Sequence, residues 1–475
     1  MRRTVALLLS AVMAVSLTGC NVKNEPAQSN STTTDSAQKD TKKDTKAGET
    51  TTAEGKKEPI TLKLWAGIQP EYGYDELVRN FNEEFADKGI QLEYTRYVNN
   101  DDGNLQLDTY LLGGDDVDVF IGYGGLSRLK KRADANLLLD MTPYLEARNF
   151  DAAKELGESN VGGYLLDGKN YGLPTKYENV NWILANVNLF KEAGIELPVD
   201  GWTYSQFLEV LPKLTKGEGP DKVYGIFWWL VGGGTTGGMG NLGAVLGKYK
   251  TYADDSCKET SFDNPVYEEG LQLMLDTMDQ GWAPSYADEK SDNLSFANVY
   301  LEGKAAMSFG ISQLRIVKDL ETYPHDFETA LIPFPVPDES FMDQADYSGI
   351  AGAGDVICVN SKTKYVDEAM DFVIWYIEGG MAPLAKGGRI PLWKDFNSDL
   401  IVEALNEKPG IFEENSLRKY LSIDATNAYE SLETGHTAEI GDIKKEGIES
   451  VLLGQKTPKE ALQDMKTRSD ALLSN

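Results

Sequence analysis

Apolar and polar positions alternate along the segment that begins at Ile60. Ile60, Leu62 and Leu64 alternate with polar residues, and the pattern ends at Trp65, before a loop at 67–70 that contains glycine and proline. A period of two residues is typical of a β-strand. We therefore expect a strand here, with the loop at its carboxyl end.

The spacing of apolar residues then changes to that of a helix. Leu77, Val78, Phe81 and Phe85 recur at helical spacing, and an extended pattern resumes at 92–95. The opening of the globular body is therefore predicted as strand, helix, strand.

A short apolar run at 117–121 is followed by three glycines, Gly122, Gly124 and Gly125. A nearly continuous apolar run is typical of a buried parallel strand. Glycine accepts the backbone conformations that a tight turn requires, so we expect a sharp loop after this strand.

Two helix starts carry clear capping signals. Thr203 is followed three residues later by Gln206, and Trp202 and Phe207 are spaced to form a hydrophobic staple. The segment 457–460 repeats this logic, with a threonine cap and proline at the first helical position.

Alternating strands and helices predict an α/β fold with largely parallel sheets. In such sheets ligands bind beyond the carboxyl ends of the strands. The loops after Trp65, Ile121 and Met307 are therefore the first places to look for a site.

The N-terminal residues have the features of a lipoprotein signal. Arg2 and Arg3 precede an apolar run at 5–17, which is shorter than the about 20 residues that a membrane-spanning helix needs. The run ends in Leu-Thr-Gly-Cys at 17–20, a lipobox. We expect residues 1–19 to be a signal peptide and Cys20 to carry the lipid; the alternative is an ordinary secretory cleavage with a free Cys20.

Residues 21–58 contain almost nothing apolar and consist largely of Thr, Ser, Lys, Asp, Glu, Gln and Ala. Such a segment cannot bury enough surface to offset the entropy of ordering it. Residues 20–58 are therefore predicted to be the lipidated cysteine and a disordered linker, which tethers the body to the outer face of the cell membrane.

Composition narrows the class of partner. The chain has 46 Lys and Arg against 75 Asp and Glu, a formal net charge of −29. Nucleic acid requires concentrated positive charge, so no nucleic-acid partner is expected. The chain after the linker is longer than the about 250–300 residues that one hydrophobic core usually serves, which predicts two lobes.

The remaining cysteines and histidines supply little chemistry. Cys257 and Cys358 form one disulfide or remain as two unpaired thiols. His325 and His436 are far apart, and no cysteine pair has metal-ligand spacing. We therefore expect no metal, no cofactor and no catalytic triad.

Several ordered motifs carry a resemblance over about residues 60–473. They are Leu-Lys-Leu-Trp at 62–65, the segments 114–119 and 168–174, the segment 188–195 with Pro198 and Trp202-Thr203, Phe296 with 303–307, and the segment 454–462. In this order and spacing the chain resembles extracellular solute-binding protein family 1, the maltose-binding-protein-like substrate-binding lipoproteins of ABC transporters.

The resemblance implies a periplasmic-binding-protein-like fold, with two α/β lobes and a ligand cleft between them. The chain then crosses the hinge three times, near Thr175, Phe334 and Ala385. The first lobe is 59–175 with 335–385, and the second is 176–334 with 386–475. The resemblance also implies a non-enzymatic monomer that binds a small molecule and docks on the permease of an ABC importer.

A sugar presents ring hydroxyls and a flat apolar face, so its site needs carboxylates, amides and aromatic rings. By their position in loops and in the family pattern, the predicted ligand-binding residues are Trp65, Gln69, Glu71, Tyr123, Tyr177, Glu178, Asn181, Trp228, Trp229, Ser312, Gln313, Tyr347, Ser348 and Arg389.

Several of these residues have a structural alternative. Trp65 is a core residue or a platform, and Glu178, the strongest single candidate, is a sugar-binding carboxylate or part of a hinge salt bridge. Trp228 and Trp229 form a stacking platform or a core strand end with one exposed ring. Arg389 reaches into the cleft or lies on the surface. At Ser312 and Gln313 the family often has tryptophan, so stacking there is in doubt.

The leading hypothesis is capture of a sugar or oligosaccharide for an ABC importer. The same fold could bind a peptide or another non-sugar solute, or report ligand to a membrane sensor. A glycosidase that uses Glu71 and Glu178 as paired carboxylates is a further hypothesis.

Overall fold

The strands form three sheets in the part of the chain that the computed structural model describes, which is residues 59–114, 116–177, 182–233, 251–348, 355–427, 432 and 434–474. The strands are β1 (Ile60–Ala66), β2 (Ile90–Arg96), β3 (Val119–Gly122), β4 (Leu173–Pro174), β5 (Lys176–Tyr177), β6 (Trp182–Asn186), β7 (Met307–Ser308), β8 (Thr329–Pro333), β9 (Val356–Val359) and β10 (Ile390–Pro391).

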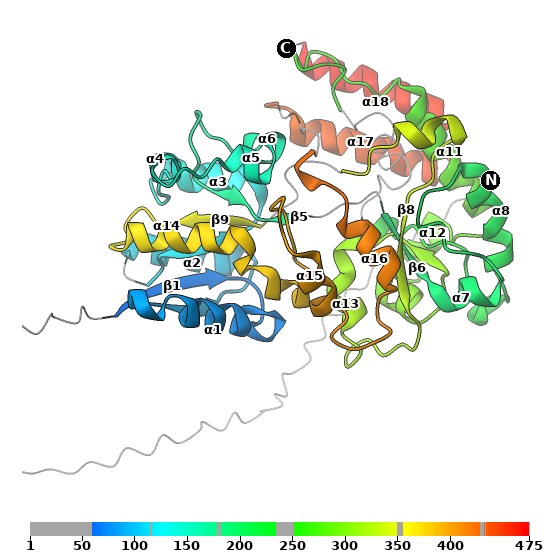
Figure 1. Ribbon diagram of the computed structural model, residues 1–475. Coiled ribbons are helices and arrows are strands. Elements are labelled where there is room, and N and C mark those ends of the chain that lie inside the picture. The colour runs from blue at the N-terminus through cyan, green and yellow to red at the C-terminus, as the bar shows by residue number, and fades with distance from the viewer. Residues whose placement is uncertain are drawn as a thin grey trace, which may run out of the picture. The chain divides into compact units, whose positions relative to one another are not determined.

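The helices lie around these sheets (Figure 1). They are α1 (Tyr74–Glu84), α2 (Asp101–Gly113), α3 (Gly125–Asp134), α4 (Thr142–Ala147), α5 (Ala152–Leu156), α6 (Glu158–Gly162), α7 (Val187–Glu192), α8 (Tyr204–Leu214), α9 (Leu230–Gly233), α11 (Pro265–Asp279), α12 (Tyr286–Ser291), α13 (Leu314–Lys318), α14 (Val366–Trp375), α15 (Ser398–Leu405), α16 (Glu414–Leu421), α17 (Thr437–Leu452) and α18 (Pro458–Leu473).

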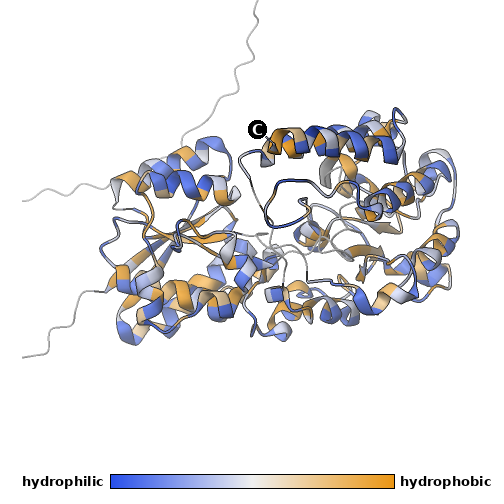
Figure 2. Ribbon diagram, turned by 90° about the horizontal axis from the view of Figure 1, so that it is seen from above, coloured by the Kyte–Doolittle hydropathy of each residue, from blue (hydrophilic) through white to orange (hydrophobic). Residues whose placement is uncertain are grey.

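The larger sheet has the strand order β2-β1-β3-β9-β4. The predicted alternation along β1 separates its two faces. Leu62 and Leu64 belong to a core cluster that includes residues of α1 and α14, whereas Trp65 belongs to the cluster that includes residues of α2 and α3. Both faces of the sheet are therefore covered, and in Figure 2 its hydrophobic strands lie between helices.

The second sheet has the order β7-β6-β8, and β5 pairs with β10 in a separate two-stranded ribbon. Ile183 of β6 and Ile332 of β8 lie in a core with residues of α8, α11, α17 and α18, while Leu184 of β6 faces the cluster that it shares with the larger sheet. One hydrophobic cluster therefore runs from one sheet to the other.

The prediction of largely parallel sheets is wrong. β1 runs parallel to β2 and β3, but β9 is antiparallel to β3 and β4, and β6 is antiparallel to both of its neighbours. The chain leaves the larger sheet after β4, enters the second at β6, and returns from β8 to β9. A strand that enters a sheet at the edge where other strands leave it must run against them. The predicted lobe boundaries stay a prediction.

The predicted local signals are confirmed. Thr203 and Thr457 each form a capping box, with Gln206 and Glu460 respectively. Gly124 has φ +94°, a left-handed conformation at the start of α3 that favours glycine.

Among the described residues, no helix combines the length and apolar character needed to cross a bilayer. The same part of the chain holds no cluster of His, Cys, Asp and Glu that could bind a metal ion.

The two cysteines outside the signal region are not joined in a disulfide. Cys358 is buried in β9, and burial raises the pKa of its thiol from 9.0 to about 12, although Arg132 partly opposes this shift. Cys257 is half-buried. A disulfide between Cys257 and Cys358 is therefore not the alternative that the structure has.

The thiols should differ in reactivity, because only a thiolate is a good nucleophile. At pH 8 iodoacetamide should modify Cys257 well before Cys358, which should react only when the protein unfolds, as peptide mapping by mass spectrometry can follow. The raised pKa also favours the folded state below about pH 9, and this contribution is lost as the pH rises toward about 12. Equal rates of modification would contradict the buried placement.

Candidate ligand-binding site

Four chain segments meet at one edge of the larger sheet. The register of β1, β3, β9 and β4 places the residues that follow β1, β3 and β4 beside the residue that precedes β9. These edge residues are Gly67, Tyr123, Thr175 and Asp355. The connections to the second sheet also leave and enter here, so this edge lies where the two sheets are joined.

The loop after β1 is held by tyrosine hydroxyls. The Tyr123 hydroxyl accepts the Gly67 N–H at 3.0 Å, and the Tyr94 hydroxyl donates to the Ile68 carbonyl. A Cβ at Gly67 would lie 2.9 Å from the Tyr123 ring, so the close approach requires glycine. Burial, followed by the nearby charge of Asp355, raises the pKa of Tyr123 well above its ordinary value, although the hydrogen bond from Gly67 opposes this shift, and the hydroxyl stays neutral.

A buried group of charges occupies the same edge. Arg389 Nε donates to the Asp355 carboxylate at 2.8 Å, and Lys176 Nζ lies 4.0 Å from its other oxygen. The side chains of Arg389, Lys176 and Asp355 are 16%, 17% and 10% exposed. The Asp355 backbone carbonyl also accepts from the Thr175 N–H and hydroxyl at 2.9 Å each, which fixes β9 to β4.

Arg389 keeps its charge in this setting. Burial alone lowers the pKa of Arg389, but Asp355 and the tyrosines Tyr123 and Tyr74 outweigh that effect, and the pKa is raised. Nε and Nη1 are used by Asp355 and by the Gly387 carbonyl. A guanidinium has five N–H donors, so these two partners occupy only part of its donor capacity.

The corresponding edge of the second sheet is aromatic. Trp182 begins β6, and Phe309 and Phe334 follow β7 and β8. Tyr347, on the connection from β8 to β9, packs against the cores of both sheets and against Trp182, with ring centroids 5.9 Å apart. The Tyr347 hydroxyl donates to the Phe334 carbonyl at 2.8 Å.

The two adjacent tryptophans lie in different surroundings. Trp228 is 2% exposed, stacks on Phe309 at 5.1 Å and donates its indole N–H to Thr277. Trp229 is only half-buried and packs near Phe296, with centroids 5.8 Å apart. A stacking role for Trp228 is therefore not supported, because the ring is buried in the core, and Trp229 is the more exposed of the two rings.

Three more predicted residues are part of the folded interior. Trp65 is 6% exposed and packs on Tyr110 at 4.8 Å, so the core alternative is the one that the structure shows. Tyr177 is buried and packs on Tyr420. Ser348 is 6% exposed and is bonded through its hydroxyl to Asp346 and to the Asn427 carbonyl.

The remaining predicted residues are on loops. Gln69 is half-buried, Glu71 is exposed on the short 3₁₀ turn η1 (Pro70–Tyr72), and Ser312 is exposed beside Gln313, whose amide donates to the Ser312 hydroxyl at 3.1 Å. Glu178 and Asn181 lie outside the described residues. The surface alternative for Arg389 is wrong, because its buried partner Asp355 holds it inside.

Asp355 and Lys176 were missed by sequence reasoning. Asp355 directly precedes the apolar strand β9, and Lys176 directly precedes the predicted Tyr177. A charged residue at the end of a buried strand is a usable signal, but its partner Arg389 is far along the chain, so the pairing itself has no local signature.

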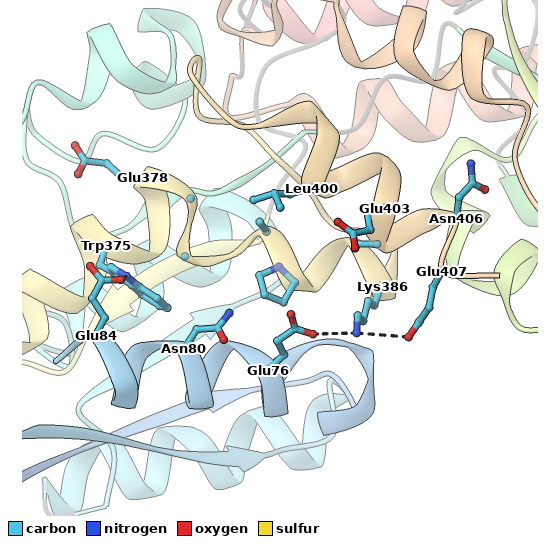
Figure 3. A pocket seen from close by; sticks show the side chains of 15 residues that line it. Glu76, Asn80, Glu84, Trp375, Glu378, Lys386, Leu400, Glu403, Asn406 and Glu407 are labelled. Carbon is cyan, nitrogen blue, oxygen red and sulfur yellow. Dashed lines mark hydrogen bonds and ion pairs between the residues drawn. The ribbon is translucent and has the colours of Figure 1, made fainter. Parts of the chain in front are cut away.

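A separate cavity of about 720 Å³ lies between α1, the turn that follows α14, and α15 (Figure 3). Trp375 and the carboxylates of Glu84, Glu378 and Glu403 line it, and Figure 3 shows Lys386 between two further glutamates. Those ion-pair partners are Glu76 at 2.9 Å and Glu407 at 3.6 Å.

None of the predicted ligand residues among those described lines this cavity. A smaller cavity of about 320 Å³ includes Glu71, beside Tyr72 and Arg315. In the sequence, the larger cavity could have been recognised from the four-residue spacing of Glu76, Asn80 and Glu84, which places them along one face of a helix.

Removing one partner of the Asp355–Arg389 pair should cost far more stability than removing one partner of an exposed pair. Asp355→Asn leaves a buried guanidinium without its counter-charge, and we expect it to lower the free energy of unfolding by about 3 kcal/mol in urea titration. The matched control is Asp134→Asn, which removes an exposed partner of Lys130 and should change it by less than about 0.5 kcal/mol. Equal effects would show that the Asp355 pair is solvated.

The fold is similar to those of several solved structures. A sugar transporter from Rhizobium etli in an open conformation is 20% identical, with a TM-score of 0.63, and the match covers 87% of this chain and 99% of that one. An ABC substrate-binding protein from Listeria monocytogenes in complex with cycloalternan is 19% identical, with a TM-score of 0.58, covering 88% and 100%. A cyclic alpha-maltosyl-1,6-maltose binding protein from Arthrobacter globiformis is 19% identical, with a TM-score of 0.60, covering 88% and 100%.

These likenesses show the fold, which is the two-lobe α/β architecture of periplasmic solute-binding proteins. We call the parts around the larger and the second sheet the first and the second lobe. The family model of bacterial extracellular solute-binding proteins matches residues 65–378, which is more than half of the chain and takes in strands of both sheets. The chain therefore belongs to the bacterial extracellular solute-binding protein family.

Proposed function

We propose that this protein is a lipid-anchored receptor that captures a sugar or an oligosaccharide outside the cell and delivers it to an ABC importer. The proposal rests on the different chemistry of two sheet edges, one charged and one aromatic. One edge offers the half-buried cations Arg389 and Lys176 with the buried acceptor Asp355, and the other offers the half-buried ring of Trp229.

This pairing suits the chemistry of a carbohydrate. Hydroxyl groups around a sugar ring need several donors and acceptors, and charge-assisted hydrogen bonds to them are stronger than neutral ones. The apolar face of the ring needs a flat aromatic partner. The similar structures from Listeria monocytogenes and Arthrobacter globiformis, which are a complex with cycloalternan and a binding protein for a cyclic maltose-based sugar, support the same ligand class.

The two-lobe fold gives the receptor a means of reporting its ligand. A ligand that contacts both edges binds the closed arrangement better than the open one, and so shifts the population between them. The importer then reads the closed form. No step in this proposal requires chemical change in the ligand, and the protein acts as a binding protein and not as an enzyme.

A thermal-shift titration with a panel of solutes tests the ligand class. Cycloalternan, maltotriose, D-mannitol, amino acids, short peptides and polyamines form the panel, and we expect stabilisation by at least one sugar because binding to the folded state raises its melting temperature. Trp229→Ala should abolish most of that shift. Trp375→Ala, which removes a half-buried tryptophan that lines the separate cavity, should not.

Two outcomes would overturn the proposal. Stabilisation by peptides, amino acids or polyamines, with none by any sugar, would assign a non-sugar ligand to the same fold. Release of smaller sugars on long incubation, lost in Glu178→Gln, would show a glycosidase.

The lipid anchor is a separate part of the proposal, supported by the lipobox at 17–20. Lipid on Cys20 supplies more than one acyl chain, and two chains hold a protein stably on a bilayer. We expect Cys20→Ala to release the protein from the membrane fraction and to abolish incorporation of a labelled fatty acid, whereas Cys257→Ala should stay in the membrane fraction and incorporate the label as the wild-type chain does. Continued membrane retention of Cys20→Ala would contradict the anchor.

A further inference from the structure

Glu289 is a buried carboxylate in α12. Glu289 is 1% exposed. Its carboxylate accepts hydrogen bonds from the backbone N–H of Val231, at 2.6 Å, and from that of Leu230. Burial raises the pKa of Glu289 although these two hydrogen bonds oppose the shift. Among the described residues no ion pair joins it to a cation, and the neighbouring Lys290 pairs with Glu449. Its hydrogen-bond donors in this part of the chain are two backbone N–H groups.

The two donors belong to the turn that presents Trp229. Trp229 directly precedes Leu230 and has φ +53°, in the left-handed region that bulky residues rarely adopt. Such a conformation persists only where the surroundings determine it from several sides. Here the surroundings do so: Trp228 is anchored in the core through its bond to Thr277, and the backbone after Trp229 is held by Glu289.

The indole of Trp229 is placed where a ligand can reach it. It is half-buried against the ring of Phe296, at an interplanar angle of 51°. Gly310 lies under the same ring, since a Cβ at this position would come within 2.6 Å of Phe296. Phe296 and Gly310 thus form a fixed floor for Trp229 at the edge of the second sheet, beside the residues that follow β7.

Glu289 differs from an ordinary helix cap. The helix that it caps, α9, has 4 residues, and the carboxylate comes from a different helix. In contrast, Glu413 caps α16 from its own sequence and is only half-buried. Moving a carboxylate into the interior is unfavourable, so the arrangement costs stability that a solvated cap does not cost. Such a cost is typical of functional sites.

We propose that Glu289 is a positioning residue, whose carboxylate fixes the backbone turn so that the Trp229 indole forms the stacking platform for a sugar ring. The part of this inference that names a sugar as the ligand rests on the proposed function. The position of the indole does not depend on the ligand and can be measured without one.

A double-mutant cycle tests the inference in the full-length protein. Glu289→Gln removes the charge at constant shape, Glu289→Asp keeps the charge but shortens its reach, and Trp229→Phe removes the reporter. Without ligand, Glu289→Gln and Glu289→Asp should change the near-UV circular dichroism and increase acrylamide quenching of tryptophan fluorescence. Both changes should disappear in the Trp229→Phe background, because the signal comes from that indole.

The matched control is Asp292→Asn, which removes an exposed charge from the end of the same helix. It should leave both spectra as in the wild type.

Calorimetry with cycloalternan and maltotriose then tests the effect on binding. Loss of a charge-assisted hydrogen bond that positions the platform should weaken the affinity of Glu289→Gln for the bound sugar about tenfold, and Asp292→Asn should leave it unchanged. In the Trp229→Phe background, Glu289→Gln should have little further effect on affinity.

The outcomes separate the two proposals. If the wild-type protein binds neither sugar, the assigned ligand fails, while the ligand-free cycle still decides whether Glu289 positions Trp229. If the spectral change persists in Trp229→Phe, or if neither Glu289 variant alters the spectra, the positioning role is overturned.

Discussion

The main constraint on this fold is that the connections between the two sheets leave and enter at a single edge of each. β4 leads out of the larger sheet, β6 begins the second, and the chain returns from β8 to β9. Because β9 enters where β1, β3 and β4 end, it runs antiparallel to β3 and β4. The same constraint brings residues that are far apart in sequence to one place, and among them are Thr175 and Asp355. The location of the candidate site is therefore determined by the connectivity of the chain, and the side chains found there determine its chemistry.

The edge of the larger sheet holds the ion pair between Arg389 and Asp355. An ion pair as buried as Arg389 and Asp355 seldom adds net stability, because desolvation offsets its Coulombic attraction. A pair that contributed only to stability could be replaced by apolar residues of the same volume. What an apolar pair cannot supply is a set of donors and acceptors in a partly dry site, where hydrogen bonds are stronger than in water. In the proposed function, these donors and acceptors are the part of the pair that a ligand would use.

Local features of the fold could be predicted from the sequence. The period-two pattern at β1, the helical spacing of α1 and the capping boxes of α8 and α18 depend on neighbours within a few residues, and all are confirmed. Strand direction could not be predicted, because it depends on where the chain re-enters a sheet after more than a hundred residues. The parallel assignment failed for that reason.

The site was predicted less completely, and the residues explain why. Trp228 and Trp229 are chemically identical neighbours, yet one is fixed by Thr277 inside the core and the other is half-exposed by a positive φ. Neither the distant Thr277 nor the backbone angle has a signature in the pair itself. Arg389 could be named as a candidate because of its loop position, but its partner Asp355 could not, since only the folded sheet brings them together.

Each half of the candidate site is ordered within its own lobe. The loop after β1 is fixed by Tyr94 and Tyr123, both from the first lobe, and the turn at Trp229 is fixed by Glu289, from the second. A site whose halves are ordered separately can open and close without rebuilding either half. The entropic cost of ordering these side chains then arises on folding and not on binding. Ligand contacts can therefore shift the equilibrium between the open and closed arrangements of the lobes. This order lowers the stability of the fold, because the backbone is strained at Trp229 and the carboxylates of Glu289 and Asp355 are desolvated.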